Sequence, residues 1–493
     1  MIYITVTLIY LAILIGIIVY KSRSVKTEDD FVVAGRSVPV YLLVGTLVCT
    51  WVGSGSLFGT AGLTFRSGFS ELWFSMGAWI GIVIIYFIAA RVRKIGQYTL
   101  TDLLETRYNK TARMLGTITI IVAYIIIAGY QFKGGGRFIN ILSNGSIDPE
   151  TGMIISAVVI IAFTALAGMV SIVSIDIFNG IIMILAMFMA LPFAISSHGG
   201  WGEVVATINA KSPEYLSMTE GHDGYWVLGV LLPTFLLLMS ESSIYQKFSS
   251  AKDAASARKA VLGMLIGVVI IEFLMCTIAV VGYAIYSEDA RFFLTDGSIN
   301  ESMSEEIILR IGYEQMPALA GSLLFAAGVA IIISTGNTFL MVTSTNVTRD
   351  LIQPYILKKK DSKTNMLVQR IVIVVLGIFA FLLVTQFTTI LEMAFISYTM
   401  IGASLAPVLL ASFFWKRVTP AGGVASILAG MIVPVINKIM EVSEVSFSIA
   451  GISFPVHTDY IAIPSLILSL IMLIAVSLLT PPSEEEKWKP FFS

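Results

Sequence analysis

Charged residues are scarce in this chain of 493 residues: 13% are Asp, Glu, Lys or Arg, while 56% are hydrophobic. A soluble domain carries roughly 25% charged residues, so the composition excludes a soluble enzyme. The high apolar content also excludes a disordered chain. The formal net charge is −1. Because the chain has neither a basic excess nor a basic tail, we expect no nucleic-acid partner.

Residues that build metal centres and disulfide frameworks are also few. The two cysteines, Cys49 and Cys276, lie in separate apolar runs, and the three histidines form no cluster, so neither kind of site is predicted. The sequence contains no HExxH, GxSxG or GxxxxGK[ST] motif, which are signatures of zinc proteases, serine hydrolases and P-loop NTPases. We therefore expect no enzymatic activity, no transition metal and no organic cofactor.

Long hydrophobic runs, in contrast, fill the chain. A membrane-spanning helix needs about 20 mostly apolar residues. Thirteen runs meet this requirement: 2–20, 39–64, 70–90, 115–143, 152–172, 176–197, 226–246, 260–286, 316–347, 366–386, 389–414, 421–440 and 458–480. The first run lacks the basic start and cleavage site of a signal peptide. The sequence therefore predicts an all-α polytopic protein of about 13 transmembrane helices in a lipid bilayer.

The distribution of Lys and Arg predicts how the chain crosses the membrane. With the N-terminus outside, the inner connections hold 24 of these residues and the outer connections hold 5. Cytoplasmic loops are enriched in Lys and Arg, so we predict an outer N-terminus and a cytoplasmic C-terminus. The compact loops favour a bacterial inner (plasma) membrane. The acidic outer connection 287–315 fits either a solvated loop or a vestibule that gathers cations.

Two predicted spans contain polar interruptions. The second reads LVCTWVGSGSLFGTAGL (47–63), and the alternating Gly and Ser of residues 53–56 predict an unwound stretch with free backbone groups. Close helix packing through small residues is the alternative. The seventh reads LLLMSESSIYQK (236–247). There, Glu241 marks either a second break or a side chain that snorkels near the boundary set by Lys247.

The two interruptions lie five spans apart, as in transporters built from two inverted repeats. We predict one repeat over 39–197 and the other over 226–414. A leading helix and inner loop (1–38) precede the repeats, and two trailing helices with a short tail (421–493) follow them, all within one membrane transport domain.

Other polar residues inside the predicted spans are candidate sites, because such residues are costly in a bilayer. The adjacent hydroxyls of Ser334 and Thr335, together with freed carbonyls, suit a small monovalent cation such as sodium, although helix hydroxyls also bond back to their own turn. Asp176 starts the sixth span, where a helix N-cap is the alternative interpretation. The sequence leaves open whether Lys133 pairs with Glu241 or Asp176, or faces a substrate carboxylate.

Five ordered motifs carry a family resemblance. The motifs are TEDDFVVAGRSVPVYLLVGTL (27–47), YTLTDLLETRYNK (98–110), YQKFSSAKDAASARKA (245–260), AAGVAIIISTGNTFLMVTSTNVTRD (326–350) and GASLAPVLLASFFWKRVTPAGGVASILAG (402–430). They resemble the motifs of the sodium/solute symporter family, which includes sodium/glucose, proline, sialic acid and choline transporters. The resemblance implies a five-plus-five inverted-repeat core with discontinuous helices, and sodium-driven symport by alternating access.

The resemblance also implies a sodium site. Its residues would supply backbone carbonyls, two hydroxyls and a supporting carboxylate: Cys49, Val52, Ile331, Ser334, Thr335 and Asp176. The chain departs from the family's T-D-x-x-Q pattern, because it reads Ile175-Asp176-Ile177-Phe178-Asn179. The number of coupled sodium ions therefore stays open.

The substrate is predicted in outline only. Trp51 is similar to the tryptophan of the choline branch, whose aromatic cage holds a cation, and Glu241 also favours a cationic amine. Lys133 suits a carboxylate, so a zwitterion such as an amino acid or betaine would satisfy both charges. The candidate substrate residues are Trp51, Ser54, Ser56, Gln131, Lys133, Glu241 and Ser242.

The sequence thus predicts a sodium-coupled importer of a small organic solute, with an amine, amino acid or other zwitterion favoured. Import of a carboxylate or sugar is the first alternative, and an uncoupled channel or sensor is the second. The expected partners are the bilayer, the sodium ion and the solute, with no obligatory protein partner.

Overall fold

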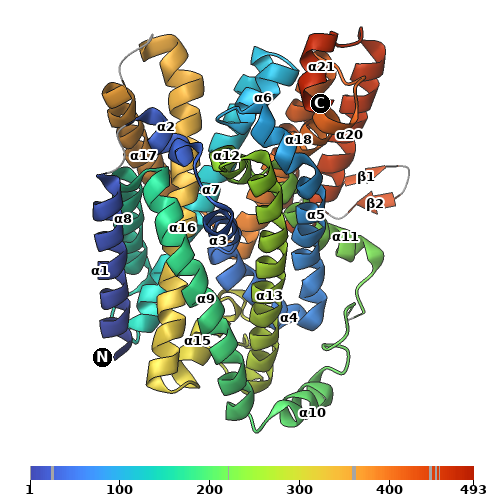
Figure 1. The fold of residues 1–493 in the computed structure, drawn as a ribbon. Helices are drawn as coiled ribbons and strands as arrows, with labels where there is room; N and C mark the ends of the chain where they lie inside the picture. The colour runs from blue at the N-terminus through green and yellow to red at the C-terminus, as the bar shows by residue number, and fades with distance from the viewer. Residues whose placement is uncertain are drawn as a thin grey trace.

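The chain forms a bundle of helices (Figure 1). The computed structural model describes residues 2–23, 27–219, 221–357, 362–443, 447–449, 452–454 and 456–492. Four basic residues of the predicted inner connections, Lys26, Lys358, Lys359 and Lys360, lie outside the described residues.

Long helices alternate with short helical segments along the whole chain. The first half contains α1 (Ile2–Ser22), α2 (Glu28–Val33), η1 (Ala34–Arg36), α3 (Val40–Trp51), η2 (Gly55–Thr60), α4 (Ala61–Ser67), η3 (Gly68–Glu71), α5 (Leu72–Ile95), α6 (Leu100–Arg107), α7 (Lys110–Leu142), α8 (Pro149–Ala167), α9 (Met169–Ser197) and α10 (Trp201–Lys211). The second half contains α11 (Gly224–Ser240), α12 (Ser242–Ser250), α13 (Ala254–Tyr286), α14 (Glu301–Ser304), α15 (Ile307–Glu314), α16 (Ala318–Asn346), η4 (Val347–Leu357), α17 (Ser362–Val384), α18 (Ile390–Phe414), α19 (Pro420–Val442), η5 (Thr458–Tyr460), α20 (Ala462–Leu479) and α21 (Glu485–Phe492).

The all-helical membrane architecture is confirmed, but the count of thirteen spans is not. Twelve helical stretches of the described chain are long and apolar enough to cross a membrane. The difference lies in the predicted span 39–64. Its first part, α3, has only 12 residues, and its second part runs on into α5 as one stretch from Gly55 to Ile95. The predicted interruption therefore divides this span between two structural elements.

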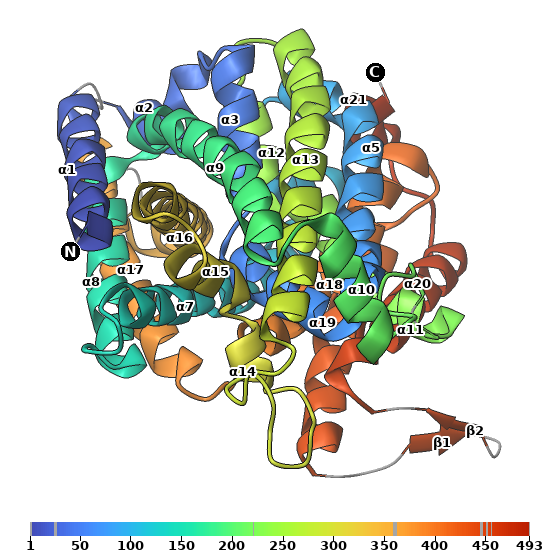
Figure 2. The ribbon, with the colours of Figure 1, turned by 90° about the horizontal axis from the view of Figure 1, so that it is seen from below.

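Burial separates the helices that face lipid from those that form the interior. Along α17, α19 and α20, large apolar side chains such as Phe379, Ile439 and Leu479 are exposed, as expected where hydrocarbon replaces water. Nearly all of α16 and α18 is buried. Figure 2, viewed along the bundle, shows α16 surrounded by α1, α7, α8, α9 and α17.

Two predicted boundaries are wrong. Gly168 takes a positive φ of 81° and ends α8, so α9 begins at Met169 rather than at residue 176. Asp176 consequently lies inside α9 and is not a helix N-cap. The polar connections 198–225 and 287–315 also contain short helices, α10 in the first and α14 with α15 in the second.

A buried ion pair fastens the acidic connection to the bundle. Glu305 pairs with Arg137 of α7 and accepts the backbone N–H groups of Ile390 (3.1 Å) and Leu391 (2.8 Å) at the start of α18. Glu306 is also largely buried. The connection is therefore partly an internal structural element, and the interpretation as a wholly solvated loop is wrong for these two residues.

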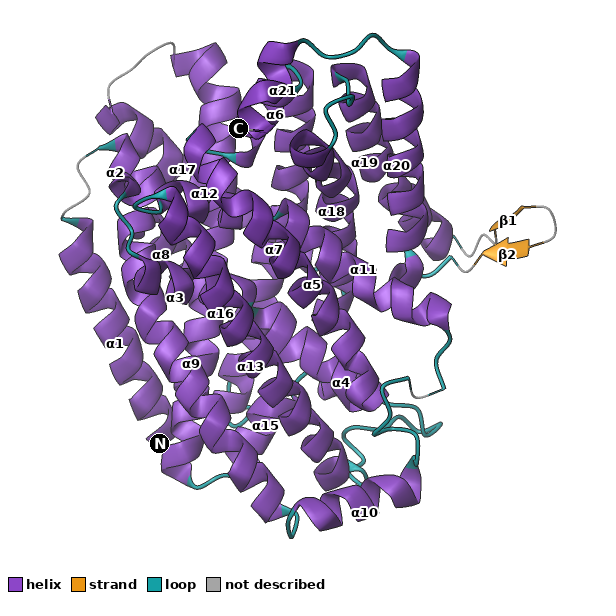
Figure 3. Ribbon diagram, turned by 45° about the vertical axis from the view of Figure 1, so that its right-hand side comes forward, coloured by secondary structure: helices purple, strands orange, loops and turns teal. Residues whose placement is uncertain are grey.

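One small sheet accompanies the helices. Strand β1 (Phe447–Ile449) pairs antiparallel with β2 (Ile452–Phe454), with Phe447 opposite Phe454. Figure 3 shows this hairpin standing away from the side of the bundle. The N- and C-termini lie toward opposite ends of the helices (Figure 1).

Candidate sodium and substrate site

The predicted break in the first repeat lies at the end of α3. Val52 follows this helix in an extended conformation (φ −78°, ψ 100°), and the helix resumes at Gly55. The hydroxyl Oγ1 of Thr335 in α16 lies 3.2 Å from the carbonyl oxygens of both Cys49 and Val52. A break in one helix thus turns two carbonyl groups toward a hydroxyl of another.

Glycine is required inside this break. A Cβ atom on Gly53 would lie 2.8 Å from the Thr335 methyl group and 3.1 Å from the Gln131 amide nitrogen. The close approach of the unwound backbone to α7 and α16 therefore depends on the missing side chain. The alternative of simple helix packing through small residues is wrong here, because the segment is unwound as well as closely packed.

The second break lies at Glu241, as predicted. This residue ends α11 and begins α12 with φ −67° and ψ 97°. Its carboxylate accepts the Tyr124 hydroxyl at 2.5 Å and the Ser243 hydroxyl at 2.7 Å. Tyr124 in turn accepts the backbone N–H of Ser242 at 2.7 Å. Glu241 is 1% exposed, so the snorkelling interpretation is wrong.

Asp176 lies beside the hydroxyl groups of α16. Its two carboxylate oxygens accept the hydroxyls of Ser334 and Thr46, each at 2.5 Å. The ammonium group of Lys247 lies 3.8 Å away, and Lys247 also donates to the Thr46 carbonyl at 3.0 Å and to the Thr50 hydroxyl. Lys247 is completely buried and therefore does not mark a water boundary.

Five of the six predicted sodium-site residues lie on α3, α9 and α16, which meet at the first break, and the sixth, Val52, directly follows α3. Cys49 and Val52 contribute carbonyls next to Thr335, while Ser334 connects the group to Asp176. Ile331 lies one turn before Thr335 in α16, and it is buried. Because α16 is continuous, the carbonyls freed from helical bonding come from the break after α3. Hard oxygen donors of this kind suit a sodium ion.

Five predicted substrate residues lie around the two breaks. Gln131 of α7 accepts the backbone N–H of Ser54 at 3.0 Å, Ser56 is buried in η2, and Ser242 begins α12 beside Glu241. Among the described residues, four buried polar atoms here have no hydrogen-bond partner: Ser54 Oγ, Gln131 Nε2, Glu241 Oε2 and Ser242 Oγ. Buried polar atoms normally have partners, so these atoms indicate a place for a polar ligand or water.

Two predicted substrate residues have other contacts. Lys133 donates to the carbonyl of Phe387 at 2.5 Å and forms an ion pair with neither Glu241 nor Asp176, so the alternative of a structural pair, which the sequence left open, is wrong. The indole N–H of Trp51 donates to Glu272 of α13 at 2.7 Å. Both contacts join residues more than 200 positions apart in the chain, and no local pattern predicts them.

Sequence analysis missed Lys247, Tyr124, Glu71 and Glu272. Glu71 and Glu272 lie in the predicted spans 70–90 and 260–286 and are 0% and 4% exposed. Their charge inside apolar runs was the available signal. Tyr124 gave no signal, because a tyrosine in an apolar helix is commonplace.

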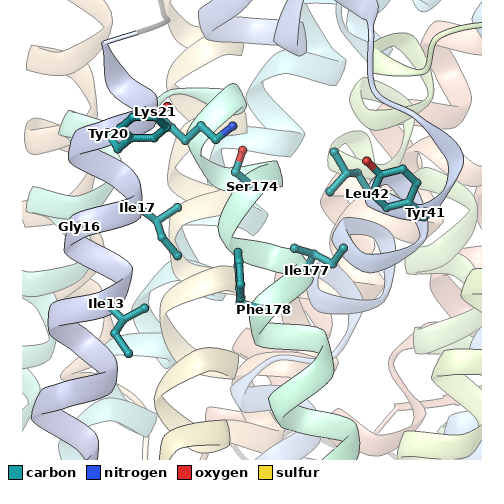
Figure 4. A pocket seen from close by; sticks show the side chains of 10 residues that line it. All are labelled: Ile13, Gly16, Ile17, Tyr20, Lys21, Tyr41, Leu42, Ser174, Ile177 and Phe178. Atoms are coloured by element: carbon teal, nitrogen blue, oxygen red, sulfur yellow. The ribbon is translucent and has the colours of Figure 1, made fainter.

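Two cavities of the described chain lie away from the breaks. A groove of about 580 Å³ lies between α1, α3 and α9, and Figure 4 shows Lys21 and Ser174 above its apolar wall. A second cavity of about 320 Å³ has a polar lining that includes Arg66, Glu392 and Lys438. Two Lys438 ion pairs, to Glu392 at 2.9 Å and to Glu441 at 2.8 Å, border this second cavity.

The broken helices and their facing polar groups define a class of protein: a secondary transporter with an inverted-repeat core. A sequence model of the sodium:solute symporter family matches residues 31–430. The chain therefore belongs to the sodium:solute symporter family, as predicted, and is an integral membrane protein. Membership assigns sodium-coupled symport to the chain, with sodium as the coupling ion.

Two curated relatives are proline transporters. The sodium/proline symporter of Staphylococcus aureus is 26% identical over 97% of this chain and 92% of that protein. The high-affinity proline transporter PutP of Bacillus subtilis (strain 168) is 28% identical over 95% of this chain and 96% of that protein.

Solved structures support the fold. A substrate-bound, outward-open sodium-coupled sialic acid symporter gives a TM-score of 0.80 at 16% identity, with 98% of this chain and 99% of that chain covered. MhsT in complex with L-phenylalanine gives a TM-score of 0.55 at 14% identity, with 89% of this chain and 97% of that chain covered.

Proposed function

We propose that the chain imports a small organic amine, amino acid or other zwitterion together with sodium, by alternating access. The observation that carries the proposal is the convergence of the Cys49 and Val52 carbonyls on Thr335, beside Ser334 and Asp176. These groups and the Ile331 carbonyl would hold sodium. The solute would bind where the unpartnered polar atoms of Ser54, Gln131, Glu241 and Ser242 lie.

Sodium binding would draw the broken end of α3 toward α16, and solute binding between the two breaks would permit closure. The membrane potential supplies the driving force. Each sodium ion that enters a cell with an inside potential of −100 mV contributes about 2.3 kcal/mol before any concentration gradient is counted. The proline transporters among the relatives support an amino-acid-like solute.

The proposal includes the arrangement of the chain in the membrane. The repeats would be 39–197 and 226–414, with the N-terminus outside and the C-terminus in the cytoplasm of a bacterial cell. The opposite positions of the termini in Figure 1 support an odd number of crossings. The excess of Lys and Arg in the inner connections supports the orientation.

The test is the thermal stability of the purified protein in sodium and in potassium, with a panel of amines, amino acids, sugars and carboxylates. A ligand that binds the native state raises the melting temperature. We expect a sodium-specific rise that one class of nitrogen-containing solute increases further. Equal melting temperatures in sodium and potassium would contradict the sodium site, and stabilisation by a sugar alone would contradict the solute class.

A further inference from the structure

Two buried carboxylates of the described chain have no basic partner, and one of them, Glu272, lies next to the first break. Glu272 of α13 accepts the indole N–H groups of Trp51 at 2.7 Å and Trp79 at 2.6 Å. Glu71, which ends η3, accepts the hydroxyl of Ser75 at 3.0 Å, and its other oxygen Oε2 has no hydrogen-bond partner. The two carboxylates lie close enough to each other to interact electrostatically.

Two other buried carboxylates of this molecule have a counter-charge. The buried carboxylates of Asp176 and Glu305 have the cations Lys247 and Arg137 beside them. Within the described chain, no Lys or Arg side chain lies within ion-pair distance of Glu71 or Glu272. Uncompensated buried charge is costly in a membrane protein and marks a functional group.

Contacts connect this pair to the proposed solute site. Trp51 is the last residue of α3, directly before the break. Phe74, three residues after Glu71, stacks with Tyr398 at a ring-centroid distance of 6.4 Å. A Cβ atom on Gly55, where the helix resumes, would lie 2.6 Å from the Tyr398 hydroxyl. Glu272 of α13 thus contacts the last residue before the break, and Glu71 at the end of η3 is connected to the break through Phe74 and Tyr398.

We infer that the solute is an organic amine with net positive charge, and that its ammonium group binds between Glu71 and Glu272. An ammonium carries three donors and no acceptor, which matches the free oxygen of Glu71 and the remaining lone pairs of Glu272. The two indole donors orient the Glu272 carboxylate. The inference rests on the proposed symport and refines its solute class.

A zwitterion fits these charges less well than a cation. Its carboxylate would find no free ammonium group at Lys133 or Lys247, because both lysines are engaged elsewhere. Lys133 donates to the Phe387 carbonyl, and Lys247 lies beside Asp176. Glu241 keeps one oxygen, Oε2, without a partner, while its other oxygen caps α12 and accepts the Tyr124 hydroxyl.

The experiment compares ligands of different charge on the full-length protein. Melting temperatures are measured in sodium with butylamine, putrescine, L-lysine, L-proline and glycine betaine, each titrated to give an apparent affinity. The variants are Glu272→Gln, Glu71→Gln and the control Glu306→Gln, whose carboxylate pairs with Arg310 at 2.7 Å outside the breaks. A separate sodium titration is performed on every variant.

We expect the amines without a carboxylate to bind at least tenfold more tightly than L-proline or betaine. Glu272→Gln and Glu71→Gln should each weaken amine binding at least tenfold, and Glu306→Gln should behave as the original protein. The sodium titration should be unchanged in all three variants. The ligand comparison on the original protein remains decisive if a variant fails to fold.

Tighter binding of proline or betaine would overturn the inference, as would amine binding that survives both substitutions. A panel in which no amine stabilises the protein would overturn it too. If sodium still raises the melting temperature in any of these cases, the proposed symport remains supported. If sodium does not raise the melting temperature of the original protein, the proposed function itself is refuted.

Discussion

Replacing Thr335 by valine tests the sodium site with the least change in shape. The substitution keeps the volume of the side chain but removes the hydroxyl that lies 3.2 Å from the carbonyl oxygens of Cys49 and Val52. Without sodium, the buried carbonyls at the break lose a donor, which costs about 1–3 kcal/mol of stability. With sodium, the ion loses one of its oxygen ligands.

A polar contact to a charged group contributes about 1.5–3 kcal/mol. Loss of the Thr335 hydroxyl from the sodium ion therefore corresponds to roughly 10- to 100-fold weaker sodium binding. The assay is a sodium titration of the melting temperature at constant ionic strength, with potassium as the replacement ion. The midpoint for Thr335→Val should therefore move to at least tenfold higher sodium concentration.

Thr343→Val provides a matched control on the same helix. The Thr343 hydroxyl is equally buried, but it donates to the Phe339 carbonyl of its own helix at 2.7 Å. This variant should lose no more than about 1 kcal/mol of stability and should keep the original sodium midpoint. An unchanged midpoint in Thr335→Val, or an equal change in both variants, would refute the assignment of Thr335 as a sodium ligand.

Three further predictions concern other parts of the molecule. Glu305→Gln leaves the buried Arg137 without its counter-charge and should cost about 3–5 kcal/mol, seen as a lower melting temperature in sodium and potassium alike; an unchanged value would contradict a structural role. Gly53→Ala should abolish sodium-dependent uptake into proteoliposomes while the protein still folds, because its methyl group has no space at the break. Hydrogen bonds from Arg291 lower the pKa of Asp289. The contacts between Arg291 and the ionised Asp289 therefore stabilise the folded protein above the ordinary carboxylate pKa near 4, and this contribution is lost as the pH falls. Arg291→Gln should therefore lower the melting temperature at pH 7, and progressively less as the pH falls below the ordinary carboxylate pKa; a difference independent of pH would contradict the assignment.

Length and hydrophobicity were sufficient to predict long membrane helices, although not the number of spans, and polar residues inside apolar runs predicted both breaks. Glycine and serine at residues 53–56, and a carboxylate inside an apolar run at Glu241, are local signals, and each lies at the predicted break. Boundaries were less reliable, because Gly168 ends α8 through a positive φ while the hydropathy of the surrounding sequence is continuous. Asp176 was consequently placed at a helix start instead of an interior position.

The partners of the site residues could not be predicted in the same way. Trp51 was expected to face the solute, but its indole N–H is held by Glu272, 221 residues further along the chain. Lys247 follows a polar segment that resembles a water boundary, yet tertiary packing buries it completely. Hydropathy describes one segment at a time, whereas these contacts depend on which helices become neighbours.

Lys247 has a consequence for how the two ligands communicate. Its ammonium group fastens the end of α12 to α3, through Thr46 and Thr50, and lies close to Asp176 of α9. A shift of α12 therefore changes the surroundings of the carboxylate that holds the Ser334 hydroxyl. Thermodynamic reciprocity then applies: if a solute on α12 strengthens sodium binding by some factor, sodium strengthens solute binding by the same factor. A single buried lysine thus provides a physical connection through which the two affinities can be coupled.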